Sequence, residues 1–154
     1  MKKQKDAKTG LEIESNNLEI NSFSLSLATN NQPLSSNEVE FGETLYITLN
    51  DVKGFVLKNN NCFPGCEIAL TDSKGNQILY IQDAYERYSK DGVSQTDART
   101  LNSDLNIGYP MQVNETYVWK IRFWDKEGKG EIKSELNLKV KANRTKIDYK
   151  TEGN

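Results

Sequence analysis

A chain of 154 residues with 20 basic and 22 acidic side chains has a net charge of −2, too little to attract nucleic acid or an anionic membrane. Its length allows one domain with its own hydrophobic core, without several disulfides or a metal. No apolar run approaches the roughly 20 residues of a membrane-spanning helix, so we expect a soluble protein without a transmembrane segment.

Both ends of the chain are polar. Residues 1–10 are rich in lysine and no apolar stretch follows them, so they do not form a signal peptide, and we expect a disordered tether. Such a tether suits a lipid-anchored protein from which an export signal has been removed, and it equally describes an ordinary frayed terminus. Residues 142–154 are predicted to be a loosely ordered tail. Residues 11–141 are then a single domain.

Apolar and polar residues alternate through most of this domain, which predicts β-strands. The alternation changes phase near Asn21 and Ser22, where we expect a bulge or a change of strand. Turn-forming residues separate the strands. About eight short strands with one apolar face each predict an all-β fold, a two-layer antiparallel β-sandwich. The alternating sets are Leu11/Ile13, Leu18/Ile20, Phe23/Leu25/Leu27, Val39/Phe41, Leu45/Ile47/Leu49, Ile68/Leu70, Leu105/Ile107, Tyr117/Trp119/Ile121/Phe123 and Ile132/Leu136/Leu138/Val140.

One segment breaks the alternation. Residues 83–92 can form a helical turn or two that end at Gly92, and the run from Ser94 to Asp97 has the sequence of a helix cap. We therefore expect a short, partly helical crossover around residues 83–100 between the two sheets.

The clearest element is a hairpin over residues 114–141, in which each strand has a large apolar face. Charged residues of both signs occupy the opposite faces, where they are expected to pair across the hairpin and to face solvent. These charged residues are Lys120, Arg122, Glu131, Lys133, Glu135 and Lys139.

The start of this hairpin, Asn114-Glu-Thr-Tyr117-Val-Trp-Lys-Ile-Arg122, resembles the immunoglobulin-like and fibronectin type III sandwiches. The likeness covers about the last quarter of the chain. It implies a corner tyrosine at Tyr117, with its hydroxyl bonded to nearby backbone. It also implies an extracytoplasmic protein, periplasmic or on the cell surface, because such modules are common in secreted and lipid-anchored bacterial proteins. The chain departs from the pattern in two ways. Its early strands lack a tryptophan, and the segment from residue 50 to residue 100 is longer than the corresponding part of either kind of domain.

Cys62-Phe-Pro-Gly-Cys66 is the sharpest local motif. Pro-Gly is the preferred centre of a type II turn, which would bring the two cysteines together. We expect a structural disulfide between Cys62 and Cys66. Two reduced thiols are the alternative, followed by a metal or redox site, which is disfavoured by the absence of histidine and of a second cysteine pair.

Nothing in the sequence indicates catalysis. The chain lacks histidine, which removes the commonest general base, and it carries no phosphate-binding loop, dinucleotide fingerprint or serine-hydrolase motif. Its acidic residues are scattered, so no pair is singled out for acid–base work. We predict a protein that is not an enzyme and needs no cofactor.

Asp51, Asp72 and Asp125 each begin an Asp-x-x-Gly turn. If their loops met at one end of the sandwich they could bind Ca²⁺, as in C2 domains. The simpler interpretation is that aspartate starts a β-turn without any ligand.

Aromatic residues supply the candidate binding surface, because they give contact area at low entropic cost. Trp124 falls on the polar face of its strand beside a turn, and Tyr85, Tyr88 and Tyr109 fall in loops or on outward positions. They can equally cover the edges of the core.

These observations predict a non-catalytic extracytoplasmic binding or adhesion module that contacts protein or glycan through loops and exposed aromatics. The alternatives are a structural subunit that assembles through sheet edges and a calcium-dependent lipid or sugar binder. The sequence leaves the oligomeric state open.

Overall fold

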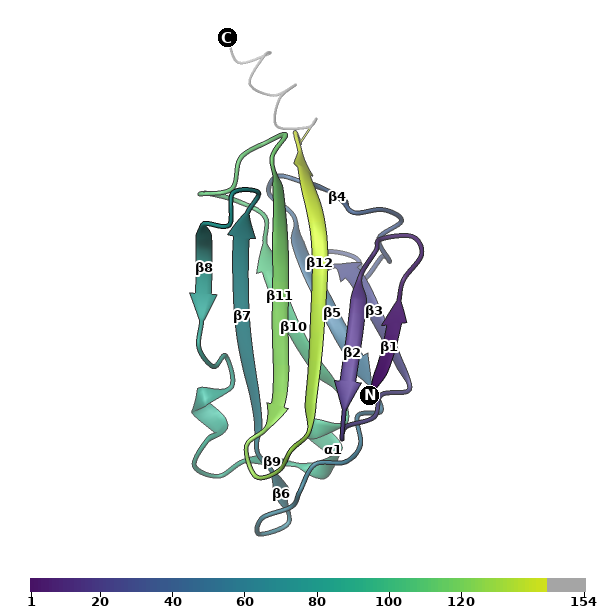
Figure 1. Cartoon of the computed structure of the whole chain (residues 1–154), viewed down its shortest axis with the longest axis vertical. Helices are drawn as coiled ribbons and strands as arrows, with labels where there is room; N and C mark the ends of the chain where they lie inside the picture. The colour runs from purple at the N-terminus through teal and green to yellow at the C-terminus, as the bar shows by residue number, and fades with distance from the viewer. Residues whose placement is uncertain (144–154) are drawn as a thin grey trace.

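A computed structural model describes residues 1–143, and it shows two β-sheets packed face to face (Figure 1). The prediction of an all-β, two-layer antiparallel sandwich is confirmed. In the described part of the chain, no helix is long and apolar enough to cross a membrane.

The larger sheet has the strand order β1-β2-β12-β11-β7-β8, and β4 pairs in parallel with the end of β12. Its centre is the predicted hairpin of β11 and β12, which are the longest strands. The bounds are β1 (Lys2–Lys5), β2 (Glu12–Asn16), β4 (Glu38–Glu40), β7 (Pro64–Asp72), β8 (Gln77–Ile81), β11 (Thr116–Asp125) and β12 (Glu131–Lys141).

The smaller sheet has the order β10-β5-β3, with β3 at Ser22–Leu27, β5 at Thr44–Asn50 and β10 at Leu101–Asn106. The chain leaves the larger sheet after β2 and enters the smaller one at Ser22. This confirms the predicted change of strand near Asn21, because a strand that moves to the other sheet must turn its apolar side the other way. Leu18 and Ile20 lie in this link and are buried, although only an isolated bridge forms there.

The core lies between the sheets and consists of the apolar residues that alternation placed on the inward faces. Trp119 and Phe123 of β11 are fully buried at its centre. The largest buried aliphatic side chains around them are Leu11, Ile13, Leu45, Ile47, Leu49, Leu70, Ile107, Ile121, Ile132 and Leu136.

The crossover between β8 and β10 contains two short helical pieces, as predicted. A 3₁₀ helix covers Glu86–Tyr88, and α1 covers Gln95–Ala98. Ser94 caps α1, because its hydroxyl accepts the backbone N–H of Asp97 at 3.0 Å. Just before α1, β9 (Val93–Ser94) pairs with β6 (Asn61–Cys62) in a two-stranded ribbon at one end of the sandwich.

The hydrogen bond implied for Tyr117 is present. The hydroxyl of this buried residue accepts the backbone N–H of Gln112, five residues upstream, at 2.7 Å. The bond holds the loop that leads into β11 against the start of that strand.

The N-terminal prediction is wrong, because residues 2–5 do not form a disordered tether. They form β1, an edge strand that pairs with β2 in the register Lys2↔Ser15 to Lys5↔Glu12. A turn stabilised by Asp6 joins the two strands: its carboxylate accepts the hydroxyl of Thr9 at 2.6 Å. β1 is polar throughout and mostly exposed, so the sequence there carries no apolar alternation that would reveal a strand. The predicted tail at 142–154 lies almost wholly outside the described residues.

Candidate binding groove

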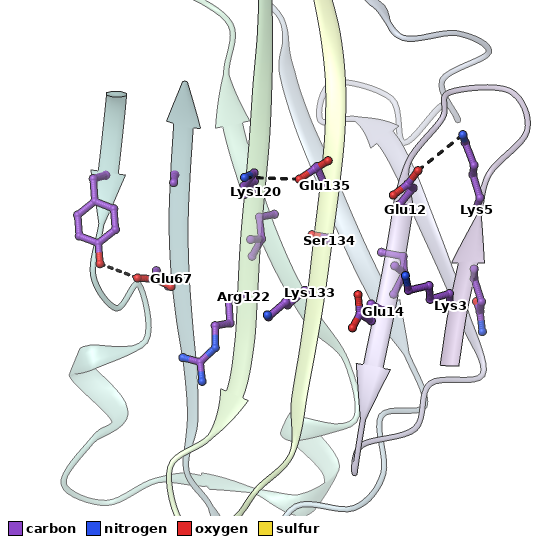
Figure 2. Close-up of a pocket in the computed structure, with 15 residues that line it drawn as sticks. Lys3, Lys5, Glu12, Glu14, Glu67, Lys120, Arg122, Lys133, Ser134 and Glu135 are labelled. Atoms are coloured by element: carbon purple, nitrogen blue, oxygen red, sulfur yellow. Dashed lines mark hydrogen bonds and ion pairs between the residues drawn. The ribbon is translucent and has the colours of Figure 1, made fainter. Parts of the chain in front are cut away.

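A groove of about 810 Å³ crosses the outer face of the larger sheet, on the side away from the core. Charged side chains of five strands line it, a sixth strand, β8, contributes Tyr80, and Figure 2 shows these side chains on one face of the sheet. We call it the transverse groove. Its charged residues are Lys3, Lys5, Glu12, Glu14, Glu67, Lys120, Arg122, Lys133 and Glu135, and Tyr80 and Ala69 also line it.

The strand registers explain why these residues meet. One row across the sheet joins Tyr80, Ala69, Lys120, Glu135, Glu12 and Lys5, each directly opposite the next. A second row, two residues along each strand, joins Glu67, Arg122, Lys133, Glu14 and Lys3. Since side chains of neighbouring rows on one face point the same way, the groove is two rows of side chains wide.

The second row places two cations side by side, Arg122 opposite Lys133. Like charges that face each other across strands destabilise a sheet. Glu131, two residues before Lys133 on β12, offsets the repulsion between these two cations. It accepts a hydrogen bond from Arg122 and makes an ion pair with Lys133 at 3.6 Å. The hydrogen bond from Arg122 lowers the pKa of Glu131, so this carboxylate stays charged. Opposite charges were expected to pair across this hairpin, and they do so at Lys120–Glu135 and Arg122–Glu131, but the residue directly opposite Arg122 is the like-charged Lys133.

The remaining charges of the groove stay accessible to a ligand. Lys120 and Glu135 are 3.6 Å apart, and Lys5 and Glu12 are also 3.6 Å apart, but all four side chains are about half exposed. Exposed pairs of this kind contribute at most about 1 kcal/mol. A ligand can therefore exchange these partners for its own groups at little cost.

A small residue makes the groove deeper at one end. Ala69 lies between Lys120 and Tyr80 in the first row, so no long side chain fills the space between them. Tyr80 bounds this hollow, and its hydroxyl donates to Glu67 at 2.6 Å. This bond to a carboxylate raises the pKa of Tyr80 and fixes the ring at the margin of the groove.

Trp124 lies on the same outer face of the larger sheet, two residues after Arg122 on β11. Its indole lies against Gly65 of β7, where a Cβ would collide with the ring, and the Arg122 guanidinium sits 4.8 Å from the ring centroid. The indole is half-buried as a result. Trp124 was predicted on the polar face beside a turn, and this placement is confirmed.

The other three predicted aromatic residues lie elsewhere. Tyr85 packs against Phe123 on the inner side of β11, and its hydroxyl donates to the carbonyl of Asn102 at 2.6 Å. Burial raises the pKa of Tyr85. Tyr88 contacts Tyr85 with its ring centroid 6.1 Å away. Tyr109 is 95% exposed in the loop before β11, at the far end of that strand from Trp124. The four residues therefore do not form one surface.

The three aspartates do not form a calcium site. Asp72 ends β7 opposite Tyr117, whereas Asp125 pairs with Pro64, so the two residues lie at opposite ends of the same strand pair, roughly 27 Å apart. The Asp125 carboxylate accepts the N–H groups of Val56 and Glu127, and that of Asp72 accepts those of Lys74 and Asn76. The Asp51 carboxylate accepts the side-chain amide of Asn21 at 3.4 Å. Within residues 1–143, no three His, Cys, Asp or Glu residues are grouped as metal ligands.

The disulfide prediction is contradicted, because Cys62 and Cys66 are unbonded and buried. Pro64 and Gly65 do not form a turn: they begin β7, and the extended chain carries Cys66 away from Cys62. Gly65 instead leaves room for the Trp124 indole, which packs directly against its backbone. Cys66 pairs with Phe123 in the sheet and is fully buried. Burial raises the pKa of the Cys66 thiol to about 12, and burial followed by the Asp125 charge raises that of Cys62.

We expect both thiols of the native protein to resist alkylation at about pH 8 and to react at once after unfolding, because buried thiols form little thiolate. The mass of the intact protein should be the same with and without reductant. A mass two hydrogens lower before reduction would contradict the structure. The raised pKa means that the folded state holds the Cys66 proton more tightly. Its contribution to stability is therefore complete below about pH 8.5 and is lost as the pH rises toward about 12.

Comparisons with known proteins do not assign the chain to a family. No protein-family model matches it, and a search of curated proteins finds no similar sequence.

Sequence reasoning identified half of the groove and missed the rest. The charged face of the β11–β12 hairpin was recognised, but as solvated surface. Lys3, Lys5, Glu12, Glu14 and Glu67 also line the groove, and none of them was predicted to belong to a binding site. The signal that was available is the alternation of charges at Lys3/Lys5 and Glu12/Glu14, the same two-residue period that marks the hairpin.

Proposed function

We propose that the protein is a non-catalytic binding module that holds an extended, charged segment of a partner protein across the transverse groove. The observation that carries this proposal is the two-row arrangement of five basic and four acidic side chains in one concave surface. The extracytoplasmic location belongs to the same proposal. It now depends on the resemblance alone, because the cysteines are unbonded and residues 2–5 form a strand.

The charges favour a polypeptide over other polymers. A uniformly anionic chain would meet the glutamates as well as the lysines, and so would gain little. A polypeptide can present both signs. Of the residues that line the groove, only Tyr80 is aromatic, so the groove lacks a broad platform for stacking sugar rings. The predicted glycan partner is therefore the less favoured of the two.

The dimensions also suit an extended segment. Six strands at a spacing of about 4.8 Å give the groove a length of about 24 Å. At roughly 3.3 Å per residue, this accommodates an extended peptide of about seven residues. Such a peptide would cross the strands rather than add to the sheet, so its side chains and not its backbone would contact the two rows.

The test is selection of linear peptides from a phage-displayed library, followed by calorimetry on the selected peptides. We expect them to carry both charges and to bind more weakly as salt rises, since screening weakens exposed ion pairs. Lys133→Glu should weaken binding about tenfold, which corresponds to the loss of one favourable ion pair. The same protein is titrated in parallel with neutral and acidic oligosaccharides.

Lys139→Glu is the matched control. Lys139 is exposed on the same face of the same strand, but it does not line the groove, and the charge change is identical. This variant should bind the selected peptides as well as the wild type does. Equal losses in both variants would show a general charge effect. If an oligosaccharide binds the wild type and Lys133→Glu abolishes that binding, the ligand of the groove is a glycan rather than a peptide.

A further inference from the structure

The two outer strands of the larger sheet differ in charge. β1 carries Lys2, Lys3 and Lys5, and lysines on an edge strand discourage pairing with another chain. β8, Gln77-Ile-Leu-Tyr-Ile81, has no charged residue and no proline. In the part of the chain that the structure describes, β8 pairs on one side only, with β7. Its other edge is a row of backbone donors and acceptors, with one register shift against β7 at Ile78.

β8 is also apolar on a side that the smaller sheet does not cover. Leu79 and Ile81 lie opposite Leu70 and Ile68, so they share the inward face of the sheet with core residues. Nevertheless they are 38% and 37% exposed. The reason is that the smaller sheet has only three strands and ends before it reaches β8. An added strand beyond β8 would cover these side chains as well as the backbone edge.

We propose that β8 is the contact of a homodimer, in which it pairs antiparallel with β8 of a second copy about a two-fold axis through Leu79. A two-fold axis perpendicular to the sheet requires a residue to face its own copy. With Leu79 on the axis, Gln77 faces Ile81 of the other copy, and the Leu79 side chains of the two copies meet on the inward face. Side chains directly opposite each other on adjacent strands interact favourably when both are apolar.

Charge favours a second copy as the occupant. Two uncharged strands do not repel each other, whereas two copies of β1 would bring lysines together. The exposed charges beyond the ends of β8 have both signs, with Lys74 before the strand and Glu86 and Arg87 after it, so antiparallel pairing of two copies gathers no single charge at either end of the contact. The dimer also puts two transverse grooves on the same side of one continuous sheet, although it does not depend on peptide binding.

Sedimentation velocity over a range of concentrations tests the dimer, with three samples besides the wild type. Leu79→Lys and Leu79→Glu each place like charges on the axis, and each should raise the dimer dissociation constant by about a hundredfold. An equimolar mixture of the two variants places opposite charges there and should restore the dimer. Gln4→Lys, at the β1 edge, is the control and should leave the dissociation constant unchanged.

Hydrogen exchange on the wild type gives a readout that needs no variant. The amides of residues 77–81 should become more protected as concentration rises, and those of residues 2–5 should not. A wild type that stays monomeric at its highest soluble concentration would overturn the proposal. So would a Leu79→Lys variant that dimerises like the wild type, or a mixture that stays monomeric. Lys133→Glu should dimerise normally, which separates this result from the groove test.

Discussion

Replacing Trp119 by alanine is expected to lower the free energy of unfolding by about 3 to 5 kcal/mol, the largest effect of any single change considered for this protein. Trp119 is fully buried in the middle of β11, opposite Leu136 of β12 and Leu70 of β7. Truncation removes its contacts with both neighbouring strands and leaves a cavity in a core that cannot fully collapse. A native stability of about 5 to 15 kcal/mol makes such a loss severe.

Chemical denaturation followed by far-ultraviolet circular dichroism measures the effect. Trp119→Phe is the graded variant, because it keeps an aromatic ring and removes the indole N–H, which has no hydrogen-bond partner in the core. It should lose clearly less stability than alanine. Lys120→Ala, the exposed neighbour on the other face, should stay within about 0.5 kcal/mol of the wild type. A loss below about 1 kcal/mol for Trp119→Ala would contradict the central placement of this residue.

The second large effect is expected at Asp83, where alanine should cost about 3 kcal/mol. One carboxylate oxygen accepts the N–H groups of Cys66 at 3.0 Å and Tyr85 at 2.9 Å, and the other pairs with Lys126. Asp83 thus ties the crossover both to β7 and to the turn between β11 and β12. Its removal leaves two backbone donors without their acceptor, and it leaves the mostly buried Lys126 ammonium group with the Ser89 hydroxyl but without a carboxylate.

Denaturation of Asp83→Ala, Asp83→Asn and Asp91→Ala separates these contributions. Asparagine can keep an acceptor for the two N–H groups but loses the charge, so it should cost about half as much as alanine. Asp91 lies in the same crossover with an exposed side chain, and its replacement should be nearly neutral. Equal stabilities for Asp83→Ala and Asp91→Ala would show that the contacts of Asp83 do not hold the crossover.

Asp83 also predicts a pH dependence. Burial raises the pKa of this carboxyl, but the hydrogen bonds from Lys126, Cys66 and Tyr85 outweigh burial and lower the pKa overall. The folded state therefore favours the charged form. Its contribution to stability is present above the unfolded pKa of about 3.9 and is lost as the pH falls through the lower folded value. The acid limb of stability against pH should be shallower in Asp83→Ala than in the wild type.

Alternation was enough to predict most strands and almost the whole core. Trp119, Phe123, Ile132 and Leu136 were placed on inward faces from sequence alone, and all four are fully buried. This works because side chains of a strand alternate strictly between its two faces. The same rule failed for residues 2–5 and for β8, because these edge strands are mostly exposed and so lack the one buried face that produces the alternation.

Local motifs were less reliable than alternation. Pro64-Gly65 has a turn sequence, but β7 needs an extended chain there to pair with β11, and Gly65 is required by the Trp124 ring. The three Asp-x-x-Gly turns do occur at strand ends, yet strand direction sends Asp72 and Asp125 to opposite ends of the sandwich. In each case the sheet, which forms many hydrogen bonds at once, overrides what four or five residues prefer alone.

The sequence by itself determined the fold class, the inward faces of the strands and the cap of α1. These features depend on residues that are neighbours in the chain or that repeat with a fixed period. Only the tertiary structure decided the strand order and register, and with them the transverse groove, the free thiols and the exposed edge of β8. Those features join strands that are distant in sequence, and no local pattern specifies which strand lies beside which.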